Sequence, residues 1–255
     1  MRAQPPKCKG RITVKKYIYK YTEGDGKNKM LLGGKGANLC EMTQIGLRVP
    51  PGFVITTEAC LDYTARNALP EGMMSNVREH MAWLEHETGK QFGGTANPLL
   101  VSVRSGSAMS MPGMMDTILN LGLNETTLDG LIKLTGNARF GYDAYRRFIQ
   151  LFGKIALGVE DKYFDEHFEA IKRRAGVKVD VGLSAEDLRD IGQLFLQVVQ
   201  EQTGKPFPQD PYEQLELAIK AVFGSWMGDR AVAYRKEFKI TPEQANGTAV
   251  NVVTM

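Results

Sequence analysis

The stretch LLVSVRSGSAMSMPGMMDT, residues 99–117, changes at Arg104 from mainly apolar residues to small polar residues, glycines and methionines. Its first part is an apolar run that predicts a strand ending at Arg104. The remainder is a loop of small hydroxyl residues, glycines and four methionines. A guanidinium offers a planar fork to phosphate oxygens, and methionine packs against flat groups such as a purine. We interpret the loop as a nucleotide-binding segment; the alternative is an ordinary loop in which Arg104 pairs with a carboxylate.

A second glycine-rich segment, GGKGAN, lies upstream at residues 33–38. Glycines let backbone N–H groups approach an anion closely, and the helix expected to follow directs its positive end the same way. Lys35 would add a point charge for a phosphate. The segment is not a Walker A loop, because that loop requires GxxxxGK followed by Ser or Thr. The alternative is a tight turn before a helix, with an exposed lysine.

Strands and helices alternate around these two segments up to about residue 124, which predicts a mixed α/β layer within an α+β fold. We expect strands at residues 14–21, 53–55, 99–104 and 118–123, and helices from about 37, 58 and 73. In the first helix, Leu39, Met42 and Ile45 recur at the spacing of one helix face. Thr57 is the expected N-cap of the second helix.

From about residue 125 to 240 the apolar periodicity is helical. Helices are predicted over 138–156, after a cap at Ser184, and after the pair Asp210-Pro211. We therefore expect residues 125–209 to form a helical insertion in a lobe made of residues 1–124 and 210–255. Residues 248–254 return to strand character. Because the sequence stops there, this strand has no obvious partner, and we expect the sequence to be a piece of a longer one.

The composition excludes several classes of protein. Of 255 residues, 43% are hydrophobic and the net charge is only +3, whereas disordered chains have few apolar residues and a high net charge. Three cysteines, Cys8, Cys40 and Cys60, cannot all pair, and no CxxC suggests a metal or redox site. Unpaired thiols fit a reducing compartment, and we expect Cys40 and Cys60 to be small core residues. No apolar run is long enough to span a membrane.

Basic residues are concentrated at the amino end. Residues 1–50 contain 11 Lys and Arg against three acidic residues, and the rest of the chain contains 21 against 26. A basic end can attract a polyanion, although a solvated basic face is the simpler interpretation. Nucleic acid is disfavoured because no RGG tract, zinc-knuckle spacing or aromatic RNP pattern occurs. The first 22 residues lack the apolar segment of a secretory signal, so we expect a cytoplasmic protein, with an organelle left open.

At its two loops the sequence resembles the pyruvate, phosphate dikinase family. The resemblance runs from about residue 17 to residue 255. It is carried by LLGGKGANLCEMTQIGLRVPPGFVITTEAC (31–60), SVRSGSAMSMPGMMDTILNLGLN (102–124) and GTAVNVVTM (247–255). The related phosphoenolpyruvate synthases share the GGKGA and VRS elements but differ where this chain has MPGMMDT, residues 111–117.

The resemblance implies the first lobe of an ATP-grasp domain. In that family, ATP and inorganic phosphate react with a histidine on a separate swivelling domain, AMP and pyrophosphate leave, and the phosphohistidine phosphorylates pyruvate. Matching the motifs makes Lys35 and Arg104 the catalytic and phosphate-contacting cations. Gly113 and Thr117 match positions that line the nucleotide. The resemblance also implies Mg²⁺ as cofactor and a homodimer for the complete enzyme.

The resemblance also indicates what this chain lacks. The family's phosphorylatable histidine lies in a Thr-Ser-His motif, and none of the three histidines here does. Its acidic Mg²⁺ ligands belong to the second half of the grasp domain, beyond residue 255. We therefore expect half of a nucleotide site and no turnover by this chain alone. Two alternatives stay open: a phosphoenolpyruvate synthase-type dikinase, in which water replaces inorganic phosphate, and a stand-alone nucleotide-binding module without catalysis.

Overall fold

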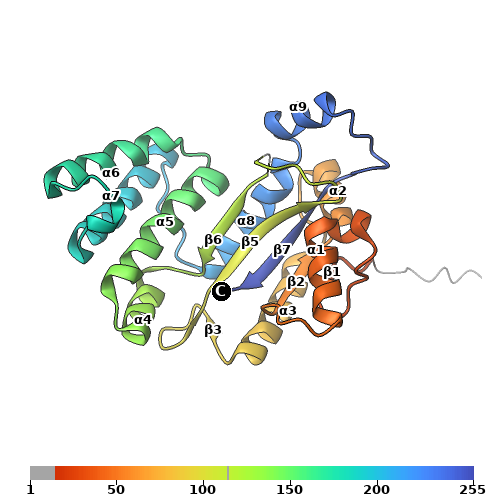
Figure 1. Ribbon diagram of the computed structural model, residues 1–255, viewed down its shortest axis with the longest axis horizontal. Coiled ribbons are helices and arrows are strands. Elements are labelled where there is room, and N and C mark those ends of the chain that lie inside the picture. The colour runs from red at the N-terminus through yellow and green to blue at the C-terminus, as the bar shows by residue number, and fades with distance from the viewer. Residues whose placement is uncertain (1–14, 114) are drawn as a thin grey trace, which may run out of the picture.

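The computed structural model describes residues 15–113 and 115–255. A five-stranded antiparallel sheet lies at the centre, with strand order β1-β2-β7-β5-β6 (Figure 1). Its strands are β1 (Ile18–Lys20), β2 (Gly52–Ile55), β5 (Val101–Ser107), β6 (Thr117–Leu121) and β7 (Thr248–Thr254). A separate parallel pair is formed by β3 (Gln91–Phe92) and β4 (Pro98–Leu99).

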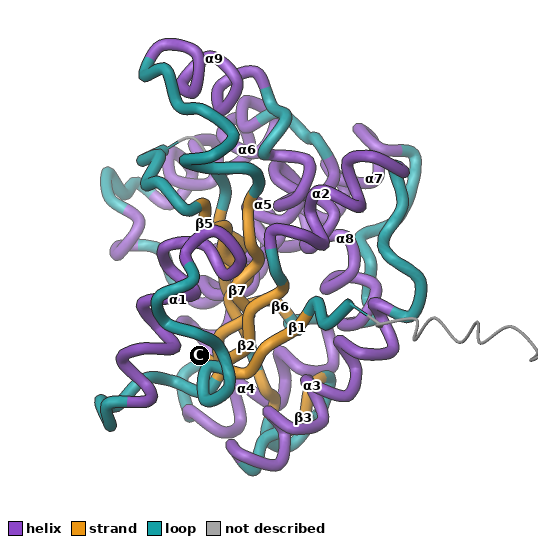
Figure 2. Tube along the Cα trace, turned by 90° about the vertical axis from the view of Figure 1, so that its right-hand side faces the viewer, coloured by secondary structure: helices purple, strands orange, loops and turns teal. Residues whose placement is uncertain are grey.

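Helices pack on both faces of this sheet (Figure 2). They are α1 (Lys29–Gln44), α2 (Thr57–Arg66), α3 (Met73–Thr88), α4 (Glu125–Thr135), α5 (Ala138–Leu157), α6 (Asp161–Ala175), α7 (Ala185–Thr203), α8 (Pro211–Ser225) and α9 (Asp229–Glu237). A short 3₁₀ turn, η1 (Asp180–Gly182), joins α6 to α7. The mixed α+β class predicted from the sequence is confirmed. None of the helices in the described part of the chain is long and apolar enough to cross a membrane.

The last strand, β7, is the centre of the sheet. Val252 lies opposite Phe53 of β2 on one side and opposite Val103 of β5 on the other. The expectation that residues 248–254 lack a partner is therefore wrong. Both neighbouring strands come from sequence more than 100 residues away, and the strand's own residues carry no information about that pairing.

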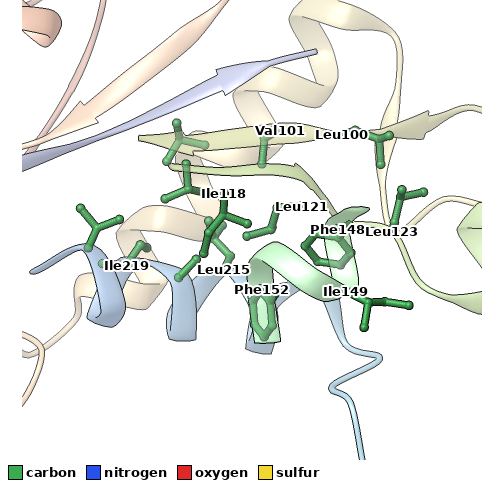
Figure 3. Packing of buried hydrophobic residues seen from close by; sticks show 14 of the residues in the cluster. Leu100, Val101, Ile118, Leu121, Leu123, Phe148, Ile149, Phe152, Leu215 and Ile219 are labelled. Carbon is green, nitrogen blue, oxygen red and sulfur yellow. The ribbon is translucent and has the colours of Figure 1, made fainter. Parts of the chain in front are cut away.

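The two faces of the sheet are packed unequally. Under α1 the buried apolar cluster is small: Tyr21, Leu32, Ala37, Cys40, Val54 and Ala249. The opposite face belongs to a far larger core, in which Leu215 and Ile219 of α8 and Phe148 of α5 pack toward the strands (Figure 3). Cys40 and Cys60 are both free and fully buried, as predicted, while Cys8 lies outside the described residues.

Two local predictions in the first helices need correction. Met42 and Ile45 are exposed, because α1 faces the sheet through Leu32, Ala37 and Cys40 instead. The N-cap of α2 is Thr56, whose hydroxyl oxygen accepts from the backbone of Ala59. Thr57 is the first helical residue, and its hydroxyl donates to the carbonyl of Met30 in α1. Its side chain therefore ties α2 to α1.

Residues 125–209 contain helices α4 to α7 and no strand among the elements described. The predicted caps at Ser184 and Asp210 are both confirmed, each with a side-chain oxygen accepting from the first turn of its helix. The aromatic residues of this region continue the core beneath the sheet: Phe207 packs edge-on against Phe148 and Phe152. Among the described residues, one buried cluster contains both Phe148 of α5 and Leu215 of α8, so the division into a lobe and an insertion stays a proposal.

Candidate functional site

The first feature of the site is an interruption inside α1. Gly33 has φ 68° and ψ 161°, which no helix accommodates, so a new helical segment begins just after it. The first N–H groups of a helix have no partner within that helix, and the positive end of its dipole lies there. Gly34, Lys35 and Gly36 are therefore placed where backbone donors favour an anion.

Gly33 also marks a direct contact between the two glycine-rich segments. A Cβ on Gly33 would lie 2.0 Å from the carbonyl oxygen of Gly106 in β5. One on Gly106 would lie 3.3 Å from the Cβ of Lys35. The N–H of Gly106 donates to the hydroxyl of Thr248 in β7 at 3.2 Å. Two segments about 70 residues apart in sequence thus meet backbone to backbone. Their contact lies where β5 ends and β7 begins.

A cavity of about 500 Å³ opens beside this contact. Its walls come from α1, from the end of β5 and the start of β6, and from the loop that joins these strands. They include Lys29, Lys35 and three serines. None of the described lining residues is Asp or Glu, so the cavity is electropositive. The lining set is Lys29, Gly34, Lys35, Asn38, Ser105, Gly106, Ser107, Ala108, Met109, Ser110, Met111, Pro112, Gly113, Met115 and Thr117.

Arg104 lies next to the cavity without lining it. It sits in β5 between Thr117 of β6 and Asn251 of β7, and its Nε donates to the Ser102 hydroxyl at 3.0 Å. Within residues 15–113 and 115–255, no carboxylate is within ion-pair distance of its guanidinium. The pairing with a carboxylate that the sequence left open is therefore not found among these residues.

Lys35 and Arg104 lie close enough to influence each other. The pKa of the Lys35 ammonium is lowered, first by its partial desolvation and then by the positive charge of Arg104. Two cations held together without a counterion repel each other. An anion bound between them would relieve that repulsion, and this is the arrangement that a phosphate-binding site requires.

Three of the four residues assigned from the sequence, Lys35, Gly113 and Thr117, line one cavity, and Arg104 adjoins it. Lys29 also lines the cavity, although it was not among the residues assigned from the sequence. Lys29 is the first residue of α1, whose N-cap Asn28 accepts from the Leu31 N–H at 3.0 Å. Asn28 was the available signal, because Asn is a preferred N-cap residue.

Acidic side chains are scarce around the cavity. The described residues contain no group of three or more His, Cys, Asp or Glu side chains that could hold a metal ion. Asp116, the acidic residue of the loop between β5 and β6, lies 3.4 Å from Arg230 and pairs with it. The described lining residues offer ammonium, hydroxyl and backbone N–H groups to a ligand.

Comparison with known proteins shows the family of this chain. The sequence matches the family described as "Pyruvate phosphate dikinase, AMP/ATP-binding domain" over residues 29–85 and 67–255. It is 62% identical over 239 residues to pyruvate, phosphate dikinase of Entamoeba histolytica, covering 93% of this chain and 27% of that protein. It is 48% identical to the Clostridium symbiosum protein of that name, covering 94% of this chain and 28% of the relative. Pyruvate, phosphate dikinase 1, chloroplastic, of Oryza sativa subsp. japonica is also 48% identical, with 95% and 26% covered.

Proposed function

This chain belongs to the pyruvate, phosphate dikinase family as its AMP/ATP-binding domain, and from that premise we propose that the cavity between α1 and the loop binds the phosphates of ATP. One observation carries the proposal. Two glycine-rich segments meet beside a cavity of about 500 Å³ that has two lysines and no carboxylate among its described lining residues. A chain of phosphates is the polyanion that such a cavity fits.

Each assigned residue has a distinct role in this proposal. Lys35 and Arg104 contact the phosphates and neutralise the charge that shifts during phosphoryl transfer. Gly113 and Thr117 line the nucleotide on the opposite wall, where a residue without a bulky side chain leaves room for it. Backbone N–H groups after Gly33 add donors that need no side-chain reorganisation.

The chain spans about a quarter of the length of the curated relatives it matches. We propose that the complete protein converts ATP, inorganic phosphate and pyruvate to AMP, pyrophosphate and phosphoenolpyruvate. The phosphohistidine, the pyruvate site and the Mg²⁺ ligands would come from the remainder of that protein, which we propose to be a homodimer. Neither nucleic acid nor a membrane is a partner in this proposal, and the cytoplasm or an organelle is its proposed location.

The two alternatives differ from this proposal in testable ways. A phosphoenolpyruvate synthase-type enzyme would use water as second acceptor, and a stand-alone module would bind nucleotide without transferring a phosphoryl group. The dikinase is favoured because residues 111–117, where the two families differ, contribute five of the residues that line the cavity. Full-length protein that forms its phosphoenzyme without inorganic phosphate would favour the synthase.

Titration calorimetry of this chain with ATP tests the proposal directly. We expect a dissociation constant of about 0.1 mM or weaker, a binding free energy no more favourable than about −5.5 kcal/mol, because half of the site is absent. Lys35→Ala should weaken binding several-fold, and inorganic tripolyphosphate should compete with ATP. Lys205→Ala is the matched control, since it removes the same charge from an exposed position after α7. Micromolar binding by this chain, or an equal effect of the two variants, would place the site elsewhere.

A further inference from the structure

Arg230, the second residue of α9, reaches across to the loop between β5 and β6. Its guanidinium donates to the carbonyl oxygen of Gly113 at 3.4 Å and to the carboxylate of Asp116 at 3.4 Å. The two acceptors lie more than 110 residues earlier in the chain. One is the backbone of a residue that lines the cavity, and the other is a side chain just before Thr117, which also lines it.

Among the described residues of the loop, the other backbone attachment near these acceptors is a hydrogen bond from the Ser105 N–H to the Asp116 carbonyl oxygen at 3.4 Å. Pro112 and Gly113 are exposed, and no atom lies within 4 Å of the position that a Cβ on Gly113 would occupy. Gly113 also has φ 72°, a conformation that is open mainly to glycine. Met111, which is buried, anchors the loop on one side of this point, and β6 begins at Thr117 on the other.

The helix that carries Arg230 is held against the rest of the molecule by two of its other residues. Figure 1 shows α9 at the top of the molecule, standing away from the sheet. Its one buried residue is Ala231, directly after Arg230. Arg235, one turn later, donates to the carbonyl of Trp226 at 2.8 Å and lies 3.8 Å from the centre of the Trp226 ring. The backbone of α9 is therefore tied down, and the Arg230 side chain is free to act as a brace.

We propose that Arg230 is a positioning residue for the nucleotide site: it braces the loop between β5 and β6 through Gly113 and Asp116 without touching the nucleotide. The proposal rests on the proposed function, because the wall that it braces is useful only if the cavity binds ATP. The braced loop keeps Gly113 and Thr117 in the cavity wall before ATP arrives. Ordering of the loop is then not part of the cost of binding.

A simpler account makes Arg230 one more positive charge that attracts ATP from a distance. The two accounts predict opposite changes in ATP affinity for Asp116→Asn. Removing a negative charge beside the cavity should tighten ATP binding if only long-range attraction matters. If Asp116 is half of the brace, the same substitution should weaken ATP binding. Asn has almost the same size as Asp, so this substitution removes the charge without removing packing contacts.

Hydrogen–deuterium exchange of the chain without nucleotide tests the brace independently of ATP. Arg230→Ala and Asp116→Asn should each speed exchange in the loop roughly two- to tenfold, the range expected for an exposed ion pair with one further hydrogen bond. The double variant should add little, since either change breaks the Asp116 contact. Exchange in α5 should not change. Unaltered loop exchange in both single variants would overturn the proposal, whatever ATP does.

ATP titrations then test positioning. Arg230→Ala and Asp116→Asn should both raise the ATP dissociation constant about two- to fivefold, and Arg230→Lys should recover part of the loss. Lys236→Ala removes the same charge from the exposed face of α9 and should have a smaller effect. Tighter binding by Asp116→Asn, or loop exchange that rises while ATP affinity stays constant, would overturn the positioning role. If the unaltered chain shows no ATP binding at all, the proposed function fails while exchange still decides the brace.

Discussion

The sheet face under α1 and the helical region of residues 125–209 are stabilised in opposite ways. Under α1, contact is made by backbone and small residues: Gly33 touches Gly106, and the buried apolar cluster has only six members. In the helical region, contact is made by aromatic rings, such as Phe164 packed edge-on against Phe195 with centroids 5.0 Å apart. At Gly33 an added Cβ would clash with the backbone, whereas the helical region is stabilised by large buried side chains.

This difference follows from what each region does. Backbone N–H groups can reach a phosphate only where no side chain intervenes, so glycine at these positions serves the proposed ATP site and leaves little apolar surface to bury. The helices have no such requirement and bury large side chains, which supply most of the hydrophobic free energy. Stability and binding are thus expected to respond to different substitutions in the two regions.

The largest effect should come from Phe195→Ala in α7. Phe195 is fully buried, and removing a buried phenyl group costs about 3–5 kcal/mol of unfolding free energy through lost burial and the cavity left behind. Urea unfolding followed by circular dichroism measures this loss. The dissociation constant for ATP should be unchanged at low temperature, where the variant is still folded. A parallel loss of ATP affinity in the folded variant would break the distinction between the two regions.

Gly33→Ala should act in the opposite sense, by adding an atom. The new Cβ would meet the Gly106 carbonyl at 2.0 Å, and φ 68° strains any residue with a side chain. We expect a loss of about 2–4 kcal/mol in unfolding free energy, with ATP binding abolished because the two segments are pushed apart. Gly34→Ala is the matched control: its Cβ would lie 3.3 Å from the nearest carbonyl, and its φ is not positive. Equal effects of the two variants would mean that the contact at Gly33 is not special.

Arg104→Ala should separate binding chemistry from stability. In the full-length protein we expect phosphohistidine formation from ATP to fall roughly 10²-fold or more, about 2.7 kcal/mol of barrier, because Arg104 acts on charge that shifts in the transition state. The transfer from phosphoenzyme to pyruvate should be almost unaffected. Rapid-quench measurement of each half-reaction tests this. A matching fall in melting temperature, or equal loss in both half-reactions, would make Arg104 a structural residue.

The sequence predicted the helical region better than the site, for a physical reason. Helix boundaries depend on neighbours in the chain, so the caps Ser184 and Asp210 could be identified from their own residue types. Both glycine segments were also found. Their contact could not be, because the interruption at Gly33 exists only where α1 meets Gly106. The central position of β7 and the exposure of Ile45 are equally products of long-range packing.

The smallest expected effect concerns the protonation of Lys35. Its pKa is lowered by desolvation and by Arg104, so it begins to lose its proton at a lower pH than an ordinary lysine. Bound phosphate favours the ammonium form and raises that pKa. Between the free and bound pKa values, ATP binding therefore takes up a proton, and affinity falls as pH rises; at lower pH the ammonium is present in both states and affinity is constant.

We expect the ATP dissociation constant to rise with pH before the range in which an ordinary lysine loses its proton, because the pKa of free Lys35 is lowered. The phosphates of ATP are already ionised in this range, so they do not contribute. Lys35→Arg keeps its charge throughout and should bind ATP with an almost flat pH profile. Calorimetric titrations of both proteins across this range make the comparison. If the ATP affinities of the two proteins fall equally as pH rises, another group titrates, and Lys35 is not the cation that faces the phosphates in the cavity.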